Sequence, residues 1–211
     1  TVVITATKSG RRQGIVTMTD YPVQFDDEYF VAYNIPDTIK AMSINDAGPN
    51  KYLDALFRGV KNFNLSNQNT NGLQYQSFGN FDLIILNELK TISSGLASEL
   101  NNYMRNGGNI LYFPSKNSDI SSVNAWLGLI GAQSFVKSNA IKKEVGQLNR
   151  DEFIFKDVYL NTRATNLKLP ISTFSFDFGN AASVAEERLM TYRDGSSFLS
   201  KYRMQDGQLF V

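Results

Sequence analysis

Four consecutive aliphatic residues, Leu83 to Leu86 in the run DLIILNEL, constrain the fold more than any other feature of this 211-residue chain. A strand with one face in water alternates apolar and polar side chains, whereas a strand covered on both faces is continuously apolar. Such strands occur mainly in parallel sheets, because crossover helices cover both faces of those sheets. The run therefore predicts a central strand of a parallel sheet.

Strand and helix patterns alternate on both sides of this run. The segments IKAMSI, from Ile39, and NILYFP, from Asn109, predict two further strands. Apolar residues at helical spacing predict helices near 51–63, 95–106 and 119–130, the first capped by Asn50. The expected inward face of that first helix consists of Tyr52, Leu53, Leu56, Phe57 and Val60. Short connections between alternating elements predict right-handed crossovers, so the expected fold class is α/β, a three-layer sandwich with a parallel sheet.

Both ends of the chain have the patterns of β structure. Residues 1–7 and 15–19 are β-branched and predict a hairpin around a turn at 9–14, followed by extended chain to Pro36. Near the C-terminus, Asp-Gly pairs at 194–195 and 206–207 predict hairpin turns between short strands. The last four residues, QLFV, read as an interrupted strand, so we expect a fragment of a longer protein.

These patterns divide the chain into two predicted domains. Residues 1–36 are expected to be the C-terminal strands of a β-sandwich domain. Residues 37–211 are expected to be the α/β domain, with an irregular segment at 137–180 and a small β-element at the end. Aromatic residues in the irregular segment could be anchors of an interaction surface or could pack beneath the loop. They are Phe153, Phe155, Tyr159, Phe174, Phe176 and Phe178.

Composition excludes several classes of function. The chain has no cysteine and no histidine, so it lacks the thiolate nucleophile, the usual general base near neutral pH and the softest metal ligands. The net charge is +1 and no basic run exceeds two residues, which argues against a nucleic-acid partner. No stretch of about 18 apolar residues predicts a membrane span. We therefore predict a protein that is not an enzyme.

Candidate metal and cofactor motifs are incomplete. The acidic run Asp26-Asp27-Glu28 lacks the alternating spacing and central glycine of a calcium loop. The segment from Ser43 to Ala47 lacks the Asp-x-Ser-x-Ser pattern of a von Willebrand-type metal site. Gly107-Gly108 ends a helix instead of opening one around a phosphate. No metal and no cofactor is predicted.

Polar residues follow two of the predicted parallel strands. Asn87 and Glu88 follow the first, and Ser115 and Lys116 follow the second. Open α/β sheets bind ligands in a crevice at the carboxyl ends of their strands, so these four residues are the candidate crevice. The alternatives are that Glu88 bonds to nearby backbone or pairs with a basic residue, and that Ser115 belongs to a plain loop. A Ser115-Lys116 dyad is disfavoured, because adjacent side chains usually point apart.

Three segments resemble a known family, the double-transmembrane proteins of bacterial Bat (aerotolerance) operons. The segments are YPVQFDDEYFVAYNI, FDLIILNELKTISSGLASELNNYMRNGGNILYFPS and RDGSSFLSKYRMQDGQLFV. The resemblance implies a β-sandwich followed by a class I glutamine amidotransferase-like fold, a variant of the flavodoxin-like architecture. It further implies a membrane-anchored protein on the periplasmic face of the inner membrane.

The resemblance also implies a function, which is non-catalytic because the family offers no catalytic residue to transfer. By this resemblance we expect a periplasmic scaffold domain whose partners are other cell-envelope proteins of the same operon. The membrane would be reached through segments outside this fragment. The alternative from another class is a cryptic hydrolase or a small-ligand or sugar-binding domain on the same fold. An open strand-end crevice lined by convergent polar groups would favour the alternative, and a plugged crevice would favour the scaffold.

Overall fold

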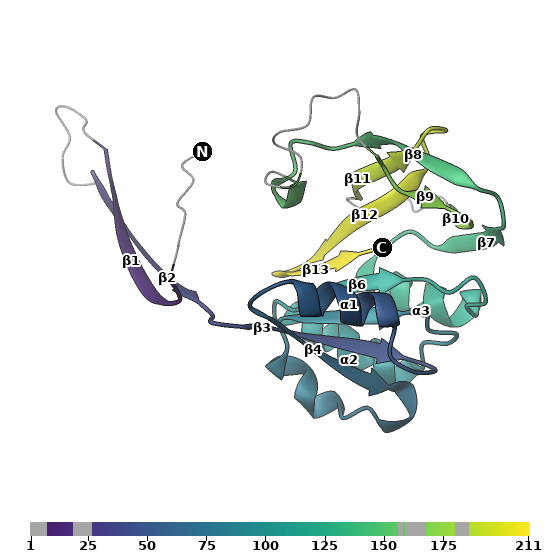
Figure 1. The fold of residues 1–211 in the computed structure, drawn as a ribbon, viewed down its shortest axis with the longest axis horizontal. Coiled ribbons are helices and arrows are strands. Elements are labelled where there is room, and N and C mark those ends of the chain that lie inside the picture. Colours follow the sequence, from purple (N-terminus) through teal and green to yellow (C-terminus); the bar gives the residue numbers. More distant parts are fainter. Residues whose placement is uncertain (1–7, 19–26, 156–157, 159–167, 180–185) are drawn as a thin grey trace.

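The computed structural model describes residues 8–18, 27–155, 158, 168–179 and 186–211. Its main feature is one nine-stranded mixed sheet with the strand order β4-β3-β5-β6-β13-β12-β11-β8-β9. Strands β3 to β6 form its parallel half, together with β13, and the remaining strands form its antiparallel half. Figure 1 shows the parallel half below and the antiparallel half above, with the hairpin β1–β2 standing apart.

The parallel half alternates strands with helices. Its elements are β3 (Ile39–Asn45), α1 (Lys51–Gly59), β4 (Phe63–Asn69), η1 (Thr70–Gly72), η2 (Tyr75–Asn80), β5 (Leu83–Asn87), α2 (Ser94–Arg105), β6 (Asn109–Phe113) and α3 (Ile120–Ile130). Strand β5 has parallel neighbours on both sides, β3 and β6, as the aliphatic run predicts. Helices α2 and α3 begin and end within one residue of the predicted bounds, because side-chain caps fix their first turns.

The antiparallel half contains the rest of the sheet. The elements that follow α3 in the chain are β7 (Phe135–Asn139), β8 (Lys143–Leu148), η3 (Phe153–Phe155), β9 (Ile171–Ser172), β10 (Ser175–Phe178), β11 (Glu187–Tyr192), β12 (Ser197–Met204) and β13 (Gly207–Phe210). Strands β7 and β10 pair separately as a two-stranded sheet. The predicted turns at 194–195 and 206–207 connect β11 to β12 and β12 to β13, which confirms them.

The predicted fold class is wrong. A three-layer sandwich has a parallel sheet covered by helices on both faces, whereas here four of the eight pairings within the large sheet are antiparallel. Among the described residues, thirteen strands accompany only three α-helices. The cause is β13, which pairs parallel with β6 on one side and antiparallel with β12 on the other. The terminal β structure is therefore half of the main sheet and not a small appended element.

The N-terminal hairpin differs in register from the predicted one. Strands β1 (Gly10–Thr17) and β2 (Glu28–Ile35) pair with one another, so the predicted turn at 9–14 lies inside a strand. Residues 1–7, which were expected to form the first strand, lie outside the described residues. Apolar side chains such as Ile15 and Phe30 are exposed on the hairpin, and an isolated hairpin is only marginally stable in water. The assignment of residues 1–36 to a β-sandwich stays a prediction.

The largest core cluster lies between the sheet and helices α2 and α3. It contains Trp126 and Tyr112, whose rings meet edge to face at 5.4 Å, and the aliphatic side chains of β5 that point to this face. A smaller cluster around Val145, Phe155 and Leu189 forms the core of the antiparallel half. Within the described residues, no helix is both long enough and apolar enough to span a bilayer.

Among the described helices, α1 alone covers the opposite face of the parallel half, and it is less buried than the periodicity predicts. Of the expected inward face, only Leu53 is buried, and Phe57 is half-buried against Phe63. Tyr52, Leu56 and Val60 are exposed. The helix also ends at Gly59 instead of 63, because β4 begins at Phe63.

Candidate functional site

The four residues of the candidate crevice line one cavity of about 620 Å3. It opens at the carboxyl ends of β3, β5 and β6, as expected for a sheet whose parallel strands end at a common edge. Asn87 and Glu88 come from the end of β5, and Ser115 and Lys116 from the loop after β6. The cavity is also lined by Asn45, Asp46, Ala47, Gly48, Asn50, Lys90, Asn117, Thr173 and Phe174.

A chain of amide side chains forms one wall of this crevice. The Asn50 Nδ2 donates to Asn87 Oδ1 at 3.1 Å, and the Asn87 Nδ2 donates to Asn45 Oδ1 at 2.8 Å. The Asn50 Oδ1 accepts the backbone N–H groups of Tyr52 and Leu53 and so caps α1, as the sequence predicts. Because each amide is held by the next, the wall is rigid before any ligand arrives, which lowers the entropic cost of binding.

Asp46 joins the loop after β3 to the loop after β5. Its Oδ2 accepts the Lys90 N–H at 2.6 Å, and its Oδ1 accepts the Thr70 hydroxyl at 3.1 Å. Both oxygens of this carboxylate are therefore occupied within the protein. Asp46 lies within the segment Ser43 to Ala47, where a von Willebrand-type metal site was sought, and it serves here to hold two loops together.

Glu88 has an unusual backbone conformation. Its φ is 51°, in the left-handed region that costs a residue with a Cβ about 1–2 kcal/mol. Its N–H donates to the Phe113 carbonyl at 2.9 Å, so the sharp turn keeps β5 attached to the end of β6. The side chain is exposed, and no hydrogen bond or ion pair within the described part of the chain reaches its carboxylate. The expected backbone or basic partner for Glu88 is therefore not present among these residues.

Replacing Glu88 with glycine should raise the free energy of unfolding by about 1 kcal/mol, because glycine adopts positive φ without steric cost. Chemical denaturation followed by circular dichroism measures this change. Gln205→Gly, at φ 53° in the turn before β13, is the matched control and should give a similar gain. A loss of stability in Glu88→Gly alone would show that the carboxylate stabilises the fold and is not held free for a ligand.

Ser115 and Lys116 form the wall opposite the amides. The Ser115 Oγ accepts the Asn117 N–H at 3.2 Å, and the Ser115 N–H donates to the Ser118 Oγ at 3.1 Å. No hydrogen bond joins Ser115 to Lys116 or to any carboxylate in the described residues. The loop thus presents a hydroxyl and an ammonium group to the crevice without the base that a serine nucleophile needs.

Thr173 and Phe174 complete the crevice from a segment that sequence reasoning placed elsewhere. They follow β9 and lie in the segment expected to form an irregular, aromatic surface. Most of its described aromatic side chains are buried or half-buried: Phe155 and Phe176 belong to the core clusters, and Phe174 and Phe178 pack against one of them. Phe153 is 78% exposed, and Tyr159 lies outside the described residues. Sequence reasoning also did not assign Asn45 and Asn50 to the crevice. The loop NDAGPN, which contains both residues, was the signal that could have pointed to them.

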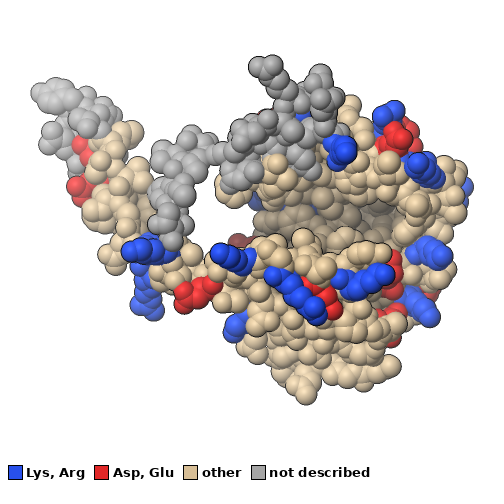
Figure 2. All heavy atoms as spheres, viewed as in Figure 1, with Lys and Arg blue, Asp and Glu red and all other residues tan. Residues whose placement is uncertain are grey.

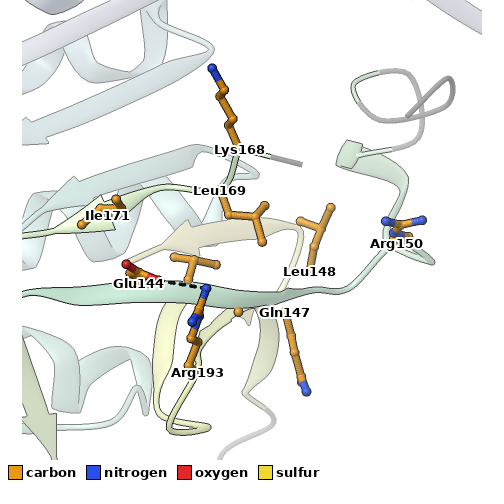
Figure 3. Close-up of a pocket in the computed structure, with 10 residues that line it drawn as sticks. Glu144, Gln147, Leu148, Arg150, Lys168, Leu169, Ile171 and Arg193 are labelled. Atoms are coloured by element: carbon orange, nitrogen blue, oxygen red, sulfur yellow. Dashed lines mark ion pairs between the residues drawn. The ribbon is translucent and has the colours of Figure 1, made fainter. Parts of the chain in front are cut away.

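A second cavity, of about 780 Å3, lies at the far edge of the sheet along β8 (Figure 3). Its lining includes Glu144 and Arg193, which pair with each other at 2.9 Å. Arg150 and Lys168 point away from one another into solvent in Figure 3. Because its charged groups are paired or diverge, this cavity lacks the convergent polar groups of a binding site.

Metal ligands are sparse in the described residues, where no group of three or more Asp or Glu side chains gathers. Of the acidic run at 26–28, Asp26 lies outside those residues, and Glu28 is exposed at the start of β2. Gly107 follows α2 with a φ of 88°, so the Gly-Gly pair ends this helix, as predicted.

No known family model matches the sequence, and no curated protein is similar enough to count as a match. Solved structures share the fold. A putative ThuA-like protein from Bacteroides uniformis is 14% identical, with a TM-score of 0.55 over 90% of this chain and 84% of its own. The exo-β-1,4-mannosidase Op5Man5 from an Opitutaceae bacterium is 12% identical, with a TM-score of 0.53 over 83% of this chain. A β-galactosidase from Rahnella sp. R3 is 14% identical, with a TM-score of 0.56 over 82% of this chain.

These likenesses concern the fold alone, because all three identities are low. The chain spans 31% of the length of the mannosidase and 28% of that of the β-galactosidase. The match to the ThuA-like protein covers so much of the chain that it must include the antiparallel half. It is therefore a likeness to the mixed architecture and not to the predicted parallel sandwich.

Proposed function

We propose that this chain is a non-catalytic recognition domain whose strand-end crevice binds a small polar ligand. The observation that carries the proposal is the convergence of Asn87, Glu88, Ser115 and Lys116 on one open cavity of about 620 Å3. A cavity of this size lies within the range that holds small molecules. A plugged crevice was the expectation for a pure scaffold, and the crevice is open.

Two features favour binding without reaction. The chain has no histidine and no cysteine, so a proton-transfer step near neutral pH would need a carboxyl or lysine group with a strongly shifted pKa. Glu88 is exposed, and no hydrogen bond joins the Ser115 hydroxyl to a carboxylate or a lysine in the described residues. The crevice therefore supplies hydrogen bonds and charges to hold a ligand but no poised base.

Ligand-observed NMR with a panel of monosaccharides, amino acids and nucleosides tests this function. At least one compound should bind, remain chemically unchanged, and bind about tenfold more weakly to Glu88→Gln and Ser115→Ala, since each change removes a direct hydrogen bond. Glu144→Gln, in the second cavity, is the control and should not alter the affinity. Turnover that is lost in Ser115→Ala or Glu88→Gln, or binding that neither change affects, would contradict the proposal.

As a further part of the proposal, we infer from the resemblance to Bat-operon proteins that this recognition domain belongs to a membrane-anchored envelope protein and lies on its periplasmic side. Its partners would then include other envelope proteins. The hairpin β1–β2 supports a role in binding a protein partner, because Ile15, Tyr29 and Phe30 are exposed on it. Crosslinking of the intact protein in its native envelope, with photoreactive residues on β2, tests this role, and crosslinks to lipid alone would contradict it.

A further inference from the structure

Among the described residues, the charges that line the crevice balance. Asp46 and Glu88 each contribute one negative charge, and Lys90 and Lys116 each contribute one positive charge. Asp46 already has both oxygens occupied by the protein. A strongly charged ligand would therefore meet as much repulsion as attraction, and a neutral ligand is favoured.

The groups left free in the crevice suit hydroxyl groups. Glu88 accepts hydrogen bonds, Lys90 and Lys116 donate them, and the hydroxyls of Ser115 and Thr173 can do both. A ligand hydroxyl is itself both donor and acceptor, so it can bond to each kind of group. Several free groups of mixed character around one cavity thus match a ligand with several hydroxyls.

Aromatic side chains border the crevice on more than one side. Phe174 lines it directly and is held edge to face on Phe176 at 6.0 Å. Phe113 lies opposite Asn87 in the register of β5 and β6, and it is 41% exposed. Its side chain points to the α1 face of the sheet, because its neighbour Tyr112 points into the core beneath α3.

Tyr52 lies on the side of α1 that faces away from the sheet edge. Asp54 bonds to Asn67 of the edge strand β4 at 2.8 Å, so that side of α1 faces the edge. Residues two apart on a helix differ by about 200° around its axis, so Tyr52 points away from β4, toward β5 and β6. Its ring is 73% exposed and begins two residues after Asn50, which lines the crevice.

The molecule is hollowed next to the half that carries α1 and the parallel strands (Figure 2). Figure 2 shows a broad hollow between the half of the molecule that carries α1 and the half that carries the antiparallel strands. Its interior is formed mostly by uncharged residues, and Lys, Arg, Asp and Glu lie around its rim. The hollow gives a ligand room to extend beyond the crevice over an uncharged surface.

From these observations we infer that the ligand is a neutral carbohydrate chain, with one sugar unit in the crevice and further units over Phe113 and Tyr52. Sugar rings have hydroxyls at their edges and C–H groups on their faces, and the C–H faces pack on the electron-rich faces of aromatic rings. Hydrogen-bonding groups in the cavity and exposed rings beside it match this pattern. The inference rests on the proposed binding function and adds the class and length of the ligand.

Calorimetric titration of the full chain with neutral oligosaccharides of one to five units tests the inference. The panel contains glucose, galactose, mannose and N-acetylglucosamine series, and oligogalacturonates serve as the acidic comparison. At least one neutral series should bind with an affinity that rises roughly three- to tenfold from one unit to three, the gain expected from an added aromatic contact. Acidic oligomers of equal length should bind more weakly.

Two substitutions separate the crevice from its extension. Tyr52→Ala and Phe113→Ala should leave the affinity for the single sugar unchanged and reduce that for the trisaccharide to nearly the same value. Both side chains are substantially exposed, so the variants should fold. Phe153→Ala removes another exposed ring, away from the crevice, and should change neither affinity.

Contrary results are distinguishable. Tighter binding of acidic oligomers, or a length dependence that survives in the Tyr52→Ala/Phe113→Ala double variant, would overturn the inference. If no carbohydrate binds but another polar compound binds in the crevice, the inference fails and the proposed function stands. If carbohydrates bind but Glu88→Gln and Ser115→Ala have no effect on the single sugar, both fail.

Discussion

Replacing Lys201 with methionine should lower the free energy of unfolding by about 3–5 kcal/mol, because it leaves the partly buried Glu152 carboxylate without its cation and leaves Glu187 paired with Arg203 alone. Lys201 lies on β12, is only 4% exposed, and contacts Glu152 at 2.9 Å and Glu187 at 2.5 Å. Denaturant titration at pH 7 measures the loss. Lys137→Met, which breaks an exposed 3.6 Å pair with Asp177, is the control and should cost less than about 1 kcal/mol.

The pH dependence of this loss follows from the pKa shifts in the cluster. Burial alone would lower the pKa of Lys201, but hydrogen bonds to Glu187 and Glu152 outweigh burial and raise it. The bond to Lys201 is the main cause that lowers the pKa of Glu187. The stabilisation from Glu187 is therefore present above its unfolded pKa and is lost as pH falls through the lowered folded pKa.

The stabilisation from Lys201 depends on pH with the opposite sign. Its stabilisation is present below the unfolded lysine pKa and is lost as pH rises through the raised folded pKa. The difference between wild type and Lys201→Met should therefore be largest between these limits and should shrink in acid, where the carboxyls are protonated. A difference below about 1 kcal/mol at pH 7, or one that grows in acid, would contradict the account.

Gly207→Ala should destabilise the protein by about 3 kcal/mol or more, since its new methyl group has no space. A Cβ at this position would collide with the Met104 carbonyl oxygen at the end of α2 and lie 2.6 Å from the Gly108 carbonyl oxygen. These are backbone atoms, so relief requires a shift of β13 or α2. Because β13 joins the two halves of the sheet, such a shift would disturb both.

Thermal or chemical denaturation of the variant measures this effect. Gly128→Ala, on α3 with nothing near the new Cβ, is the matched control and should be stabilising by about 0.5–1 kcal/mol. If Gly207→Ala were as stable as the wild type, the close approach of β13 to α2 would be wrong.

Strands β3, β5 and β6 of the parallel half were predictable because their signals are local, whereas the edge strand β4 was not predicted. The aliphatic run of β5 marks burial on both faces, and apolar residues at helical spacing mark α2 and α3. The antiparallel half was not predictable from the sequence. The place of β13 depends on simultaneous pairing with β6 and β12, and these two strands are distant in sequence from one another. Short β patterns at the end of a chain do not specify the sheet that they join.

The difference between local signals and contacts between distant segments also explains which features of α1 and of the crevice were predictable. Periodicity shows that Tyr52 and Leu56 share a helix face, but not that the sheet beside them is left partly uncovered. Asn87, Glu88, Ser115 and Lys116 were predictable as one group because parallel strands end at a common edge. Thr173 and Phe174 were not, since they reach the crevice from the antiparallel half, whose arrangement the local pattern does not contain.

Backbone amide chemical-shift mapping tests the central claim most directly, using the neutral oligosaccharide or other polar compound with the highest affinity. The account predicts that the largest shifts on titration occur at residues 87, 88, 90, 115–117 and 173–174, which line the strand-end crevice. Largest shifts at residues 144–148 and 193, which line the second cavity, would contradict it.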